Sequence, residues 1–147
     1  MQNLLQIKVL NKSKNRLPYY ASSGASGMDV LAFLENSIIV KPLDRVLIPT
    51  GLYFEIPEGY EIQVRSRSGL CLNNGIIVAN SPGTIDSDYR GELKVIILNV
   101  SKNDFEINNS DRIAQIVFSE YKKASLIISD SISSTQRMEK SFGSTGV

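Results

Sequence analysis

The sequence contains no histidine, no tryptophan and a single cysteine, Cys71. Without histidine the chain has neither a Ser-His-Asp triad nor a Cys-His pair, and it lacks imidazole ligands for zinc. One thiol cannot form an internal disulfide, so we expect a reducing, cytoplasmic setting. Hydrolytic chemistry in this chain must therefore rest on carboxylates, hydroxyls, basic side chains and a metal held largely by oxygen atoms.

A strong excess of either charge is also missing, because sixteen Lys and Arg face fifteen Asp and Glu, for a net charge of +1. This balance argues against a bulk nucleic-acid binder but permits a local basic pocket for a small polyanion. No apolar run approaches the roughly 20 residues that cross a bilayer. Residues 1–10 alternate polar with apolar side chains and lack the apolar stretch of a signal peptide. We expect neither a nucleic-acid nor a membrane partner.

Short strands dominate the hydrophobic pattern of the 147 residues, which suit one domain. Alternation of polar and apolar side chains predicts strands over 5–10 and 60–65. Runs of β-branched residues predict further strands over 38–40, 46–48, 93–100 and 113–118. Turn signals separate them at Pro42, 49–51, 57–59, 73–75 and 108–111. The spacing predicts an all-β sandwich or jelly roll, with a short helix over 68–74 and no internal repeat.

The C-terminal stretch differs in composition from the rest. Residues 131–147 are rich in Ser, Thr and Gly, which predicts a mobile tail. We therefore divide the chain into a domain over 1–134 and an arm over 135–147. Plain fraying explains such a tail, yet a lone Phe142 within it suggests that the arm covers something flat.

The densest group of polar and special residues lies between Asn80 and Glu92. Pro82 and Gly83 allow the backbone of a hairpin to approach a flat ligand closely. Two carboxylates and an aromatic ring follow within one expected strand, in which Asp86 and Asp88 point to one face and Tyr89 to the other unless a bulge intervenes. The alternative is an acidic hairpin that is merely solvated.

Three other segments carry weaker signals. The run Arg65–Leu70 alternates arginine with serine before a glycine, which suits phosphate oxygens but also a charged edge strand. Arg137 and the run Phe142–Gly146 resemble a phosphate loop only weakly. The segment Asp111–Ile116 reads by itself as a strand that begins after a turn.

Together with Ala25–Val30, these four segments resemble, in the same order, the five motifs of the trimeric dUTPase family. The resemblance implies a jelly roll of the β-clip type that forms a homotrimer with active sites at subunit interfaces. It also implies hydrolysis of dUTP to dUMP and pyrophosphate, which keeps uracil out of DNA and supplies dUMP for dTMP synthesis. The arm then becomes a lid that closes over the site of a neighbouring subunit.

The resemblance assigns a role to individual residues. Asp86 activates the water that attacks the α-phosphorus, and Tyr89 packs under the deoxyribose and excludes a 2′-hydroxyl. Mg²⁺ bridges the triphosphate, with Asp29 supporting this region through a water or an arginine. The uracil edge is read by the hairpin, and the phosphates by the helix start, the β-strand glutamine and the arm. The substrate-binding residues are Arg67, Ser68, Gly69, Asn80, Gly83, Thr84, Ile85, Asp86, Tyr89, Gln115, Arg137, Phe142, Gly143, Ser144 and Thr145.

Some positions depart from the family pattern. Met138 and Lys140-Ser141 stand where the family has glycines in the arm, Ser66 where it has proline, and Asn73 where lysine is common. Cys71 stands where alanine is common, and we expect it to fill a small core space. None of these changes removes a group assigned to the chemistry.

Two rival functions share the pattern in part. A dCTP deaminase has the same fold, but it replaces the Asp-x-Asp-Tyr stretch that Asp86–Tyr89 retains. A non-catalytic nucleotide sensor would lose the water-activating aspartate or the arm, whereas Asp86, Arg137 and Phe142 are all present. The sequence favours dUTP hydrolysis over both.

Overall fold

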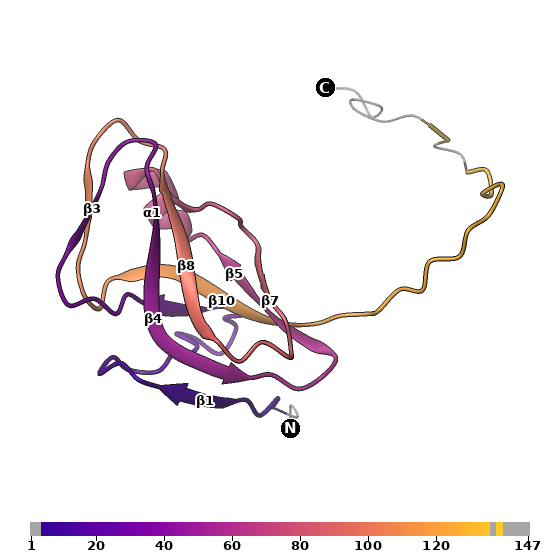
Figure 1. Cartoon of the computed structure of the whole chain (residues 1–147), viewed down its shortest axis with the longest axis horizontal. Coiled ribbons are helices and arrows are strands. Elements are labelled where there is room, and N and C mark those ends of the chain that lie inside the picture. Colours follow the sequence, from indigo (N-terminus) through magenta and orange to yellow (C-terminus); the bar gives the residue numbers. More distant parts are fainter. Residues whose placement is uncertain (1–3, 136–137, 140–147) are drawn as a thin grey trace.

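The structure is a computed structural model that describes residues 4–135 and 138–139. This part of the chain contains ten strands and one short helix (Figure 1). All strand pairs are antiparallel. The elements are β1 (Lys8–Asn11), β2 (Met28–Leu31), β3 (Ile38–Val40), β4 (Arg45–Glu55), β5 (Tyr60–Arg65), α1 (Ser68–Asn74), β6 (Ile76–Val78), β7 (Gly83–Ile85), β8 (Glu92–Asn99), β9 (Phe105–Ile107) and β10 (Arg112–Glu120).

The strands form two four-stranded sheets and one two-stranded sheet. The sheet orders are β1-β4-β8-β6, β2-β10-β5-β7 and β3-β9. Buried Ile, Val and Leu side chains from all three sheets form one core. Phe54 of β4 and Phe118 of β10 meet across it edge to face, with ring centroids 6.3 Å apart. The predicted all-β fold is confirmed, because alternating strands bury one face of each sheet in a shared core.

Several predicted elements have the bounds that the sequence indicated. The strands over 38–40 and 60–65 and the helix over 68–74 begin and end as predicted. The strand predicted over 5–10 begins later, at Lys8. Four strands of three or four residues, β2, β6, β7 and β9, were missed. They are too short to show a period, and pairing with other strands stabilises them, with longer strands for β2, β6 and β7 and with the equally short β3 for β9.

The turn predicted over 49–51 is wrong. These residues lie inside β4, where the register against β8 shifts between Pro49 and Leu52. The Thr50 hydroxyl donates a hydrogen bond to the Leu93 carbonyl at 2.6 Å and is buried. Pairing with β8 on both sides of the irregularity therefore turns a local turn signal into a β-bulge.

A small repeat was also missed. The loops Asn11–Asn15 and Asn99–Asn103 share the pattern Asn-x-Ser-Lys-Asn and have the same internal hydrogen bonds. In each loop the first asparagine accepts from the serine N–H at 2.9 Å and donates to the last asparagine's carbonyl at 2.8 Å. Each loop packs against a glycine with positive φ, Gly51 or Gly75. The first loop thereby supports the bulge in β4.

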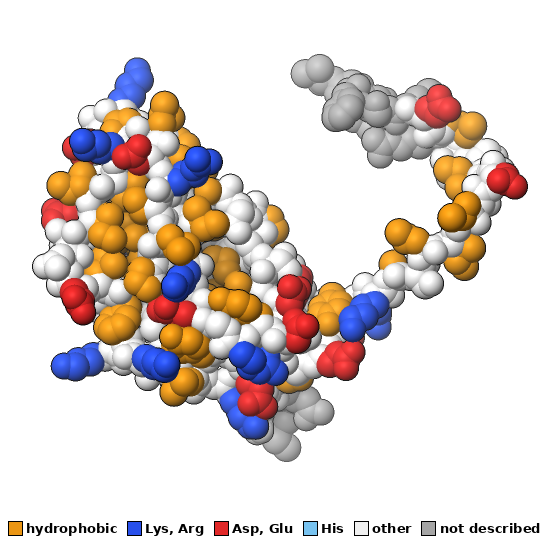
Figure 2. Space-filling view, viewed as in Figure 1, with side chains coloured by type: hydrophobic (Ala, Val, Ile, Leu, Met, Phe, Trp, Pro, Cys, Tyr) orange, Lys and Arg blue, Asp and Glu red, His pale blue; other side chains and the backbone are white. Residues whose placement is uncertain are grey.

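Apolar side chains also lie on the outside of the described chain. Leu47 of β4 and Ile96 of β8 are cross-strand partners and are 56% and 36% exposed. Figure 2 shows hydrophobic side chains gathered over this β4–β8 face. Such a face is unusual because the outward side of an antiparallel sheet normally carries polar residues.

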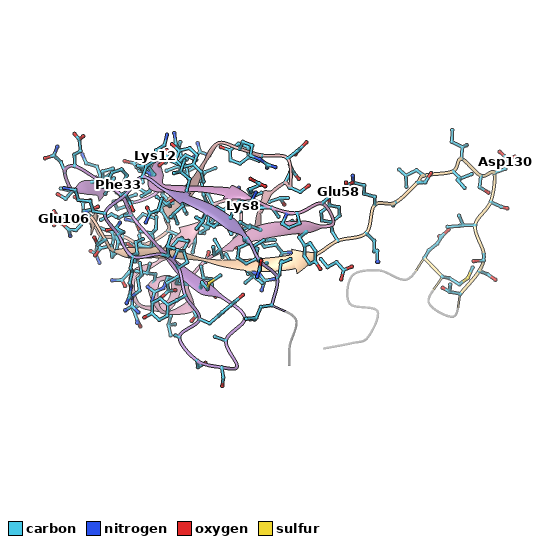
Figure 3. All side chains as sticks on the ribbon, turned by 90° about the horizontal axis from the view of Figure 1, so that it is seen from below. Lys8, Lys12, Phe33, Glu58, Glu106 and Asp130 are labelled. Atoms are coloured by element: carbon cyan, nitrogen blue, oxygen red, sulfur yellow. The ribbon has the colours of Figure 1, made fainter. Side chains whose placement is uncertain are left out.

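The chain leaves the sheets after β10. Residues 121–135 contain no helix or strand and extend away from the body (Figure 1), and Asp130 lies far from the sheets (Figure 3). Leu126, Ile127 and Ile128 in this segment are 95%, 87% and 99% exposed. Within residues 4–135 and 138–139, no helix is long and apolar enough to span a bilayer.

Candidate functional site

The hairpin that carries Asp86 is built on the edge of a sheet. Strand β7 pairs with β5 in the register Val64↔Gly83, Gln63↔Thr84 and Ile62↔Ile85. Since β7 is the last strand in the order β2-β10-β5-β7, its other edge has no strand partner among the described residues. Backbone N–H and C=O groups on that edge are free to bind a ligand that presents donors and acceptors in a plane.

The expectation that Asp86, Asp88 and Tyr89 share one extended strand is wrong. Strand β7 ends at Ile85, and a turn follows in which the Tyr89 N–H donates to the Asp86 carbonyl at 3.1 Å. The last residue of β7, Ile85, pairs with Ile62 near the start of β5. Beyond this pair the chain turns away from β5 and continues into β8 at Glu92. Both aspartates remain exposed on this turn.

Tyr89 and Asp86 border the same hollow. The rest of its lining comes from Thr84 and Ile85 of β7, Glu92 and Lys94 of β8, and Leu47 of β4. Tyr89 is 44% exposed, and its hydroxyl donates to the Glu92 carbonyl at 3.0 Å. An exposed carboxylate and a held aromatic ring therefore meet at the end of the free β7 edge.

The start of the hairpin is close-packed. Gly83 is buried, and a side chain there would lie within 3.1 Å of the Asn80 carboxamide and 3.4 Å of Val64. Asn80 itself is exposed. The absence of a side chain at Gly83 therefore allows this backbone to pack closely against Asn80 and Val64 of the same chain.

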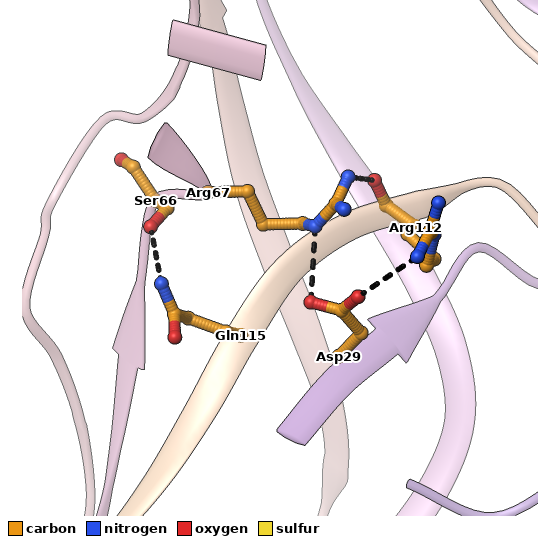
Figure 4. A network of polar contacts seen from close by, with 5 residues as sticks. All are labelled: Asp29, Ser66, Arg67, Arg112 and Gln115. Atoms are coloured by element: carbon orange, nitrogen blue, oxygen red, sulfur yellow. Dashed lines mark hydrogen bonds and ion pairs between the residues drawn. The ribbon is translucent and has the colours of Figure 1, made fainter. Parts of the chain in front are cut away.

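A second group of polar side chains lies where β2, β5 and β10 meet (Figure 4). Arg67 donates from Nε to Asp29 Oδ1 at 3.0 Å and from Nη1 to the Arg112 carbonyl at 3.1 Å. Arg112 Nη1 lies 3.6 Å from Asp29 Oδ2. One carboxylate thus orients two guanidinium groups, as expected for a site that binds phosphate oxygens. The sequence did not predict Arg112 as a site residue. Its position three residues before the predicted Gln115, in the same segment, could have indicated it.

Gln115 belongs to the same group. This β10 residue lies opposite Asp29 of β2 on one side and Arg65 of β5 on the other. Its Nε2 donates to the Ser66 carbonyl at 2.9 Å. A Cβ on Gly27 would overlap Gln115 Oε1. The glycine of the Ala25–Val30 segment therefore provides the space in which this glutamine lies.

Helix α1 begins directly after Arg67. Its first two residues, Ser68 and Gly69, are exposed, and no side chain caps its N-terminus. Their backbone N–H groups are therefore available to an anion beside the guanidinium of Arg67. Cys71 on this helix is exposed, so the expectation that it fills a core space is wrong. All of α1 lies at the surface, with no buried residue.

The two groups do not meet within one chain. Ser66 and Ser81 lie side by side at one end of the β5–β7 pair, whereas Asp86 follows the Ile62↔Ile85 pair at the other end. The strand from Ile62 to Arg65 alone covers roughly 10 Å at about 3.3 Å per residue. A substrate that contacts both groups in one chain would have to span the full length of the hairpin.

Charged side chains surround Asp86 on its other side. Glu58, Asp88, Arg90 and Lys123 line a second hollow there. The Lys123 ammonium donates to Glu58 at 3.2 Å, and this hydrogen bond, followed by the Glu58 charge, raises the pKa of Lys123. Lys123 is therefore a fixed positive charge at neutral pH where the chain leaves β10.

The arm residues predicted to close the site, Arg137, Phe142, Gly143, Ser144 and Thr145, lie outside the described residues. Met138 is described, and its backbone is left-handed with φ of 46°. Such a φ favours glycine because it has no Cβ. The family's glycine at this position agrees with the conformation that the chain adopts here.

The part of the chain that the structure describes contains no ready-made metal site. No cluster of three or more His, Cys, Asp or Glu side chains suited to a metal occurs among residues 4–135 and 138–139. Asp29 has one close hydrogen bond, and its two oxygens offer further lone pairs for a metal-bound water. Mg²⁺ commonly keeps several waters and binds substrate phosphates in such open sites.

Comparison with known families accounts for nearly the whole chain. Residues 13–146 match the dUTPase family. The chain belongs to this family. A dUTPase relative from Finegoldia magna, named deoxyuridine 5′-triphosphate nucleotidohydrolase, is 48% identical over 142 residues, 97% of this chain and 99% of that protein. A relative of the same name from Neorickettsia sennetsu is 49% identical over 147 residues and covers 99% of each chain.

Solved dUTPase structures share the fold. A mutant dUTPase of Staphylococcus bacteriophage 80alpha, solved with dUpNHpp, superposes with a TM-score of 0.87 at 26% identity, over 97% of this chain and 99% of that chain. A mutant of the dUTPase from phage phi11 of S. aureus, described with a structural Mg(II) ion, has a TM-score of 0.79 at 22% identity over 88% and 100% of the two chains. The jelly-roll fold of the dUTPase family is therefore established for this chain.

Proposed function

We propose that the chain hydrolyses dUTP to dUMP and pyrophosphate. The observation that carries this proposal is its full-length similarity to proteins named deoxyuridine 5′-triphosphate nucleotidohydrolase. The exposed Asp86 at the end of a free strand edge supplies the carboxylate that such chemistry needs. In a cell, this reaction keeps uracil out of DNA and supplies dUMP for dTMP synthesis, and we expect it in the cytoplasm.

Uracil is recognised by the free edge of β7. Backbone groups of Gly83, Thr84 and Ile85 read its planar donors and acceptors, and Asn80 closes the start of the hairpin. Cytosine presents a donor where uracil presents an acceptor, which leaves buried groups unpaired. Such a mismatch can give discrimination of about 10⁴ or more. The methyl group of thymine is refused by shape at Gly83.

Asp86 orients and activates a water for in-line attack on the α-phosphorus. The turn that follows β7 holds its carboxylate beside the hollow that Tyr89 borders. Tyr89 packs under the deoxyribose and leaves no space for a 2′-hydroxyl. A positioned general base contributes about 10²- to 10⁴-fold, and the remaining acceleration comes from positioning and charge neutralisation.

The triphosphate binds the second group of polar residues. Arg67 and the N–H groups of Ser68 and Gly69 bind phosphate oxygens, and Gln115 contacts the α-phosphate. Asp29 holds Arg67 in place, and its other lone pairs would accept from water on a nearby metal ion. Mg²⁺ would supply positive charge that neutralises part of the triphosphate. Arg137, Ser144 and Thr145 of the arm bind the γ-phosphate, and Phe142 with Gly143 covers the uracil.

A homotrimer brings the two groups together. In one chain they lie at opposite ends of the β5–β7 pair, so each active site combines Asp86 of one subunit with Arg67 of a second and the arm of the third. The exposed pair Leu47 and Ile96 and the exposed segment 126–128 supply apolar surface for this assembly. Large exposed apolar surface is typical of protein interfaces.

Pyrophosphate release from dUTP, dCTP, dTTP and UTP, with and without Mg²⁺, tests the proposal. We expect rapid release from dUTP with Mg²⁺ and little from the other three nucleotides. Ammonia release from dCTP would instead indicate a deaminase. Tight binding of dUTP without turnover would indicate a nucleotide sensor.

A further inference from the structure

We propose that Glu92 is a positioning residue that fixes the Tyr89 ring and thereby sets discrimination between deoxyribose and ribose. The inference rests on the proposed function, because it assumes that Tyr89 packs against the sugar. It concerns the last residue of the Asn80–Glu92 group, to which the sequence assigned no role, at the point where the hairpin enters β8.

The Tyr89 ring is held from two sides. Its hydroxyl donates to the Glu92 carbonyl at 3.0 Å, so the ring folds back over the intervening residues. A Cβ on Gly91 would overlap the Tyr89 ring and hydroxyl, which means that the ring occupies the space of a missing side chain. No regular strand supports Arg90 and Gly91. The position of the ring therefore depends on where Glu92 holds its own backbone.

The side chain of Glu92 anchors that backbone to β4. Its Oε1 accepts a hydrogen bond from the Gly51 N–H at 2.8 Å, and its side chain is only 17% exposed. Gly51 lies in the β4 bulge, between Pro49 and Leu52 where the β4–β8 register shifts. A bulge leaves a backbone N–H without a ladder partner, and the carboxylate satisfies it.

This anchor continues into rigid structure. Gly51 is fixed by the Asn11–Asn15 loop, because the Lys12 N–H donates to the Gly51 carbonyl at 2.8 Å and Ser13 packs against the glycine. The contact of Lys94 Nζ with Glu92 Oε2 is longer, at 3.7 Å, and lies nearer to solvent. Glu92 thus links the bulge in β4 to the Tyr89 ring, which limits the space beside the sugar for a 2′-hydroxyl.

In this arrangement, different parts of the structure support recognition of the base and recognition of the sugar. The β7 edge reads the base and is held by β5, whereas Tyr89 is held by Glu92 and β4. Loss of the Glu92 carboxylate should therefore weaken sugar discrimination and leave base discrimination intact. If Glu92 only stabilised the fold, its loss would change neither the dUTP-to-UTP ratio nor the dUTP-to-dCTP ratio of kcat/KM, or it would change both ratios equally.

The test measures kcat/KM for dUTP, UTP and dCTP in the full-length protein and in Glu92→Ala, Glu92→Gln and Thr50→Val. Glu92→Gln keeps an oxygen that can accept from Gly51, and Thr50→Val removes a bulge hydrogen bond without touching Glu92 or Tyr89. We expect Glu92→Ala to lower the dUTP-to-UTP ratio about 3- to 10-fold, the value of one hydrogen bond. The dUTP-to-dCTP ratio should not change, and the other two variants should keep both ratios.

Tyr89→Phe provides a second route if Glu92→Ala does not fold, because it removes only the hydroxyl that binds Glu92. It should lower the sugar ratio selectively in the same way. An unchanged sugar ratio in the variants that do fold, or an equal fall in Thr50→Val or in the base ratio, would overturn the role of Glu92. Absence of dUTP turnover in the unmodified protein would instead remove the proposed function itself.

Discussion

Asp29 and Asp86 occupy different surroundings although both stand in segments that resemble family motifs. Asp29 faces the guanidinium groups of Arg67 and Arg112 and therefore acts as an anchor for positive charge. Asp86 lies exposed on a turn beside an aromatic ring. The proposed chemistry follows this difference, because only the carboxylate without a close basic partner among the described residues is free to activate a water.

Replacing Asp86 with asparagine should separate chemistry from binding. Asp86→Asn keeps the size of the side chain but removes the base, so we expect pyrophosphate release to fall about 10²- to 10⁴-fold with dUTP binding nearly unchanged. Stopped-flow assays and calorimetry measure the two quantities. Asp88→Asn, on the same turn, is the matched control and should retain activity. Unaltered turnover in Asp86→Asn would remove its assigned role.

The space at Gly27 gives a second test at this scale. Gly27→Ala would push Gln115 away from the Ser66 carbonyl, since the new Cβ overlaps its Oε1. We expect KM for dUTP to rise about 3- to 10-fold through the lost contact. Gly24→Ala is the control, because a Cβ there meets nothing within 4 Å. Thermal melting separates this effect from general destabilisation, and equal KM values in the two variants would contradict it.

Elements in this protein are shaped by pairing as much as by local preference. The Pro49–Gly51 signal becomes a bulge because β8 pairs with β4 on both sides of it. Strand β7 has only three residues, yet its pairing with β5 places it at the sheet edge. The periodic strands and the helix over 68–74, which ends at a left-handed Gly75, follow the sequence, whereas the bulge and the short strands depend on distant partners.

Removal of the arm tests its role as an element. A chain ending at Thr135 lacks Arg137 and Phe142, and we expect kcat/KM for dUTP to fall at least about 10-fold, the value of one charged hydrogen bond. Light scattering should show the same number of subunits as in the full-length protein. A chain ending at Thr145 keeps every assigned residue and should retain activity. A fully active chain ending at Thr135 would rule out the lid.

Large apolar side chains are exposed on two parts of the described chain. The β4–β8 face and the segment 126–128 both carry bulky aliphatic side chains outward (Figure 2). The two groups of site residues lie apart within one chain. Both features are accounted for if subunits cover one another's apolar surfaces and share their active sites.

A charge placed in the exposed segment tests this assembly. Ile127→Asp should shift the protein toward smaller species in light scattering and reduce dUTP hydrolysis in parallel, because a carboxylate resists burial. Ser125→Asp adds the same charge nearby without removing an apolar side chain, and it should retain mass and activity. A native mass for Ile127→Asp would exclude this segment from the interface.

The sequence alone determined the all-β class, the helix over 68–74 and the family, because period, turn residues and ordered motifs are local properties of a chain. Tertiary structure decided the bulge at Gly51, the position of β7 at the sheet edge and the pairing of Asp29 with Arg67 and Arg112. These features depend on contacts between residues far apart in sequence, which no local pattern encodes. Glu92 belongs with them, since its partners Gly51 and Tyr89 come together only when β4 and β8 pair.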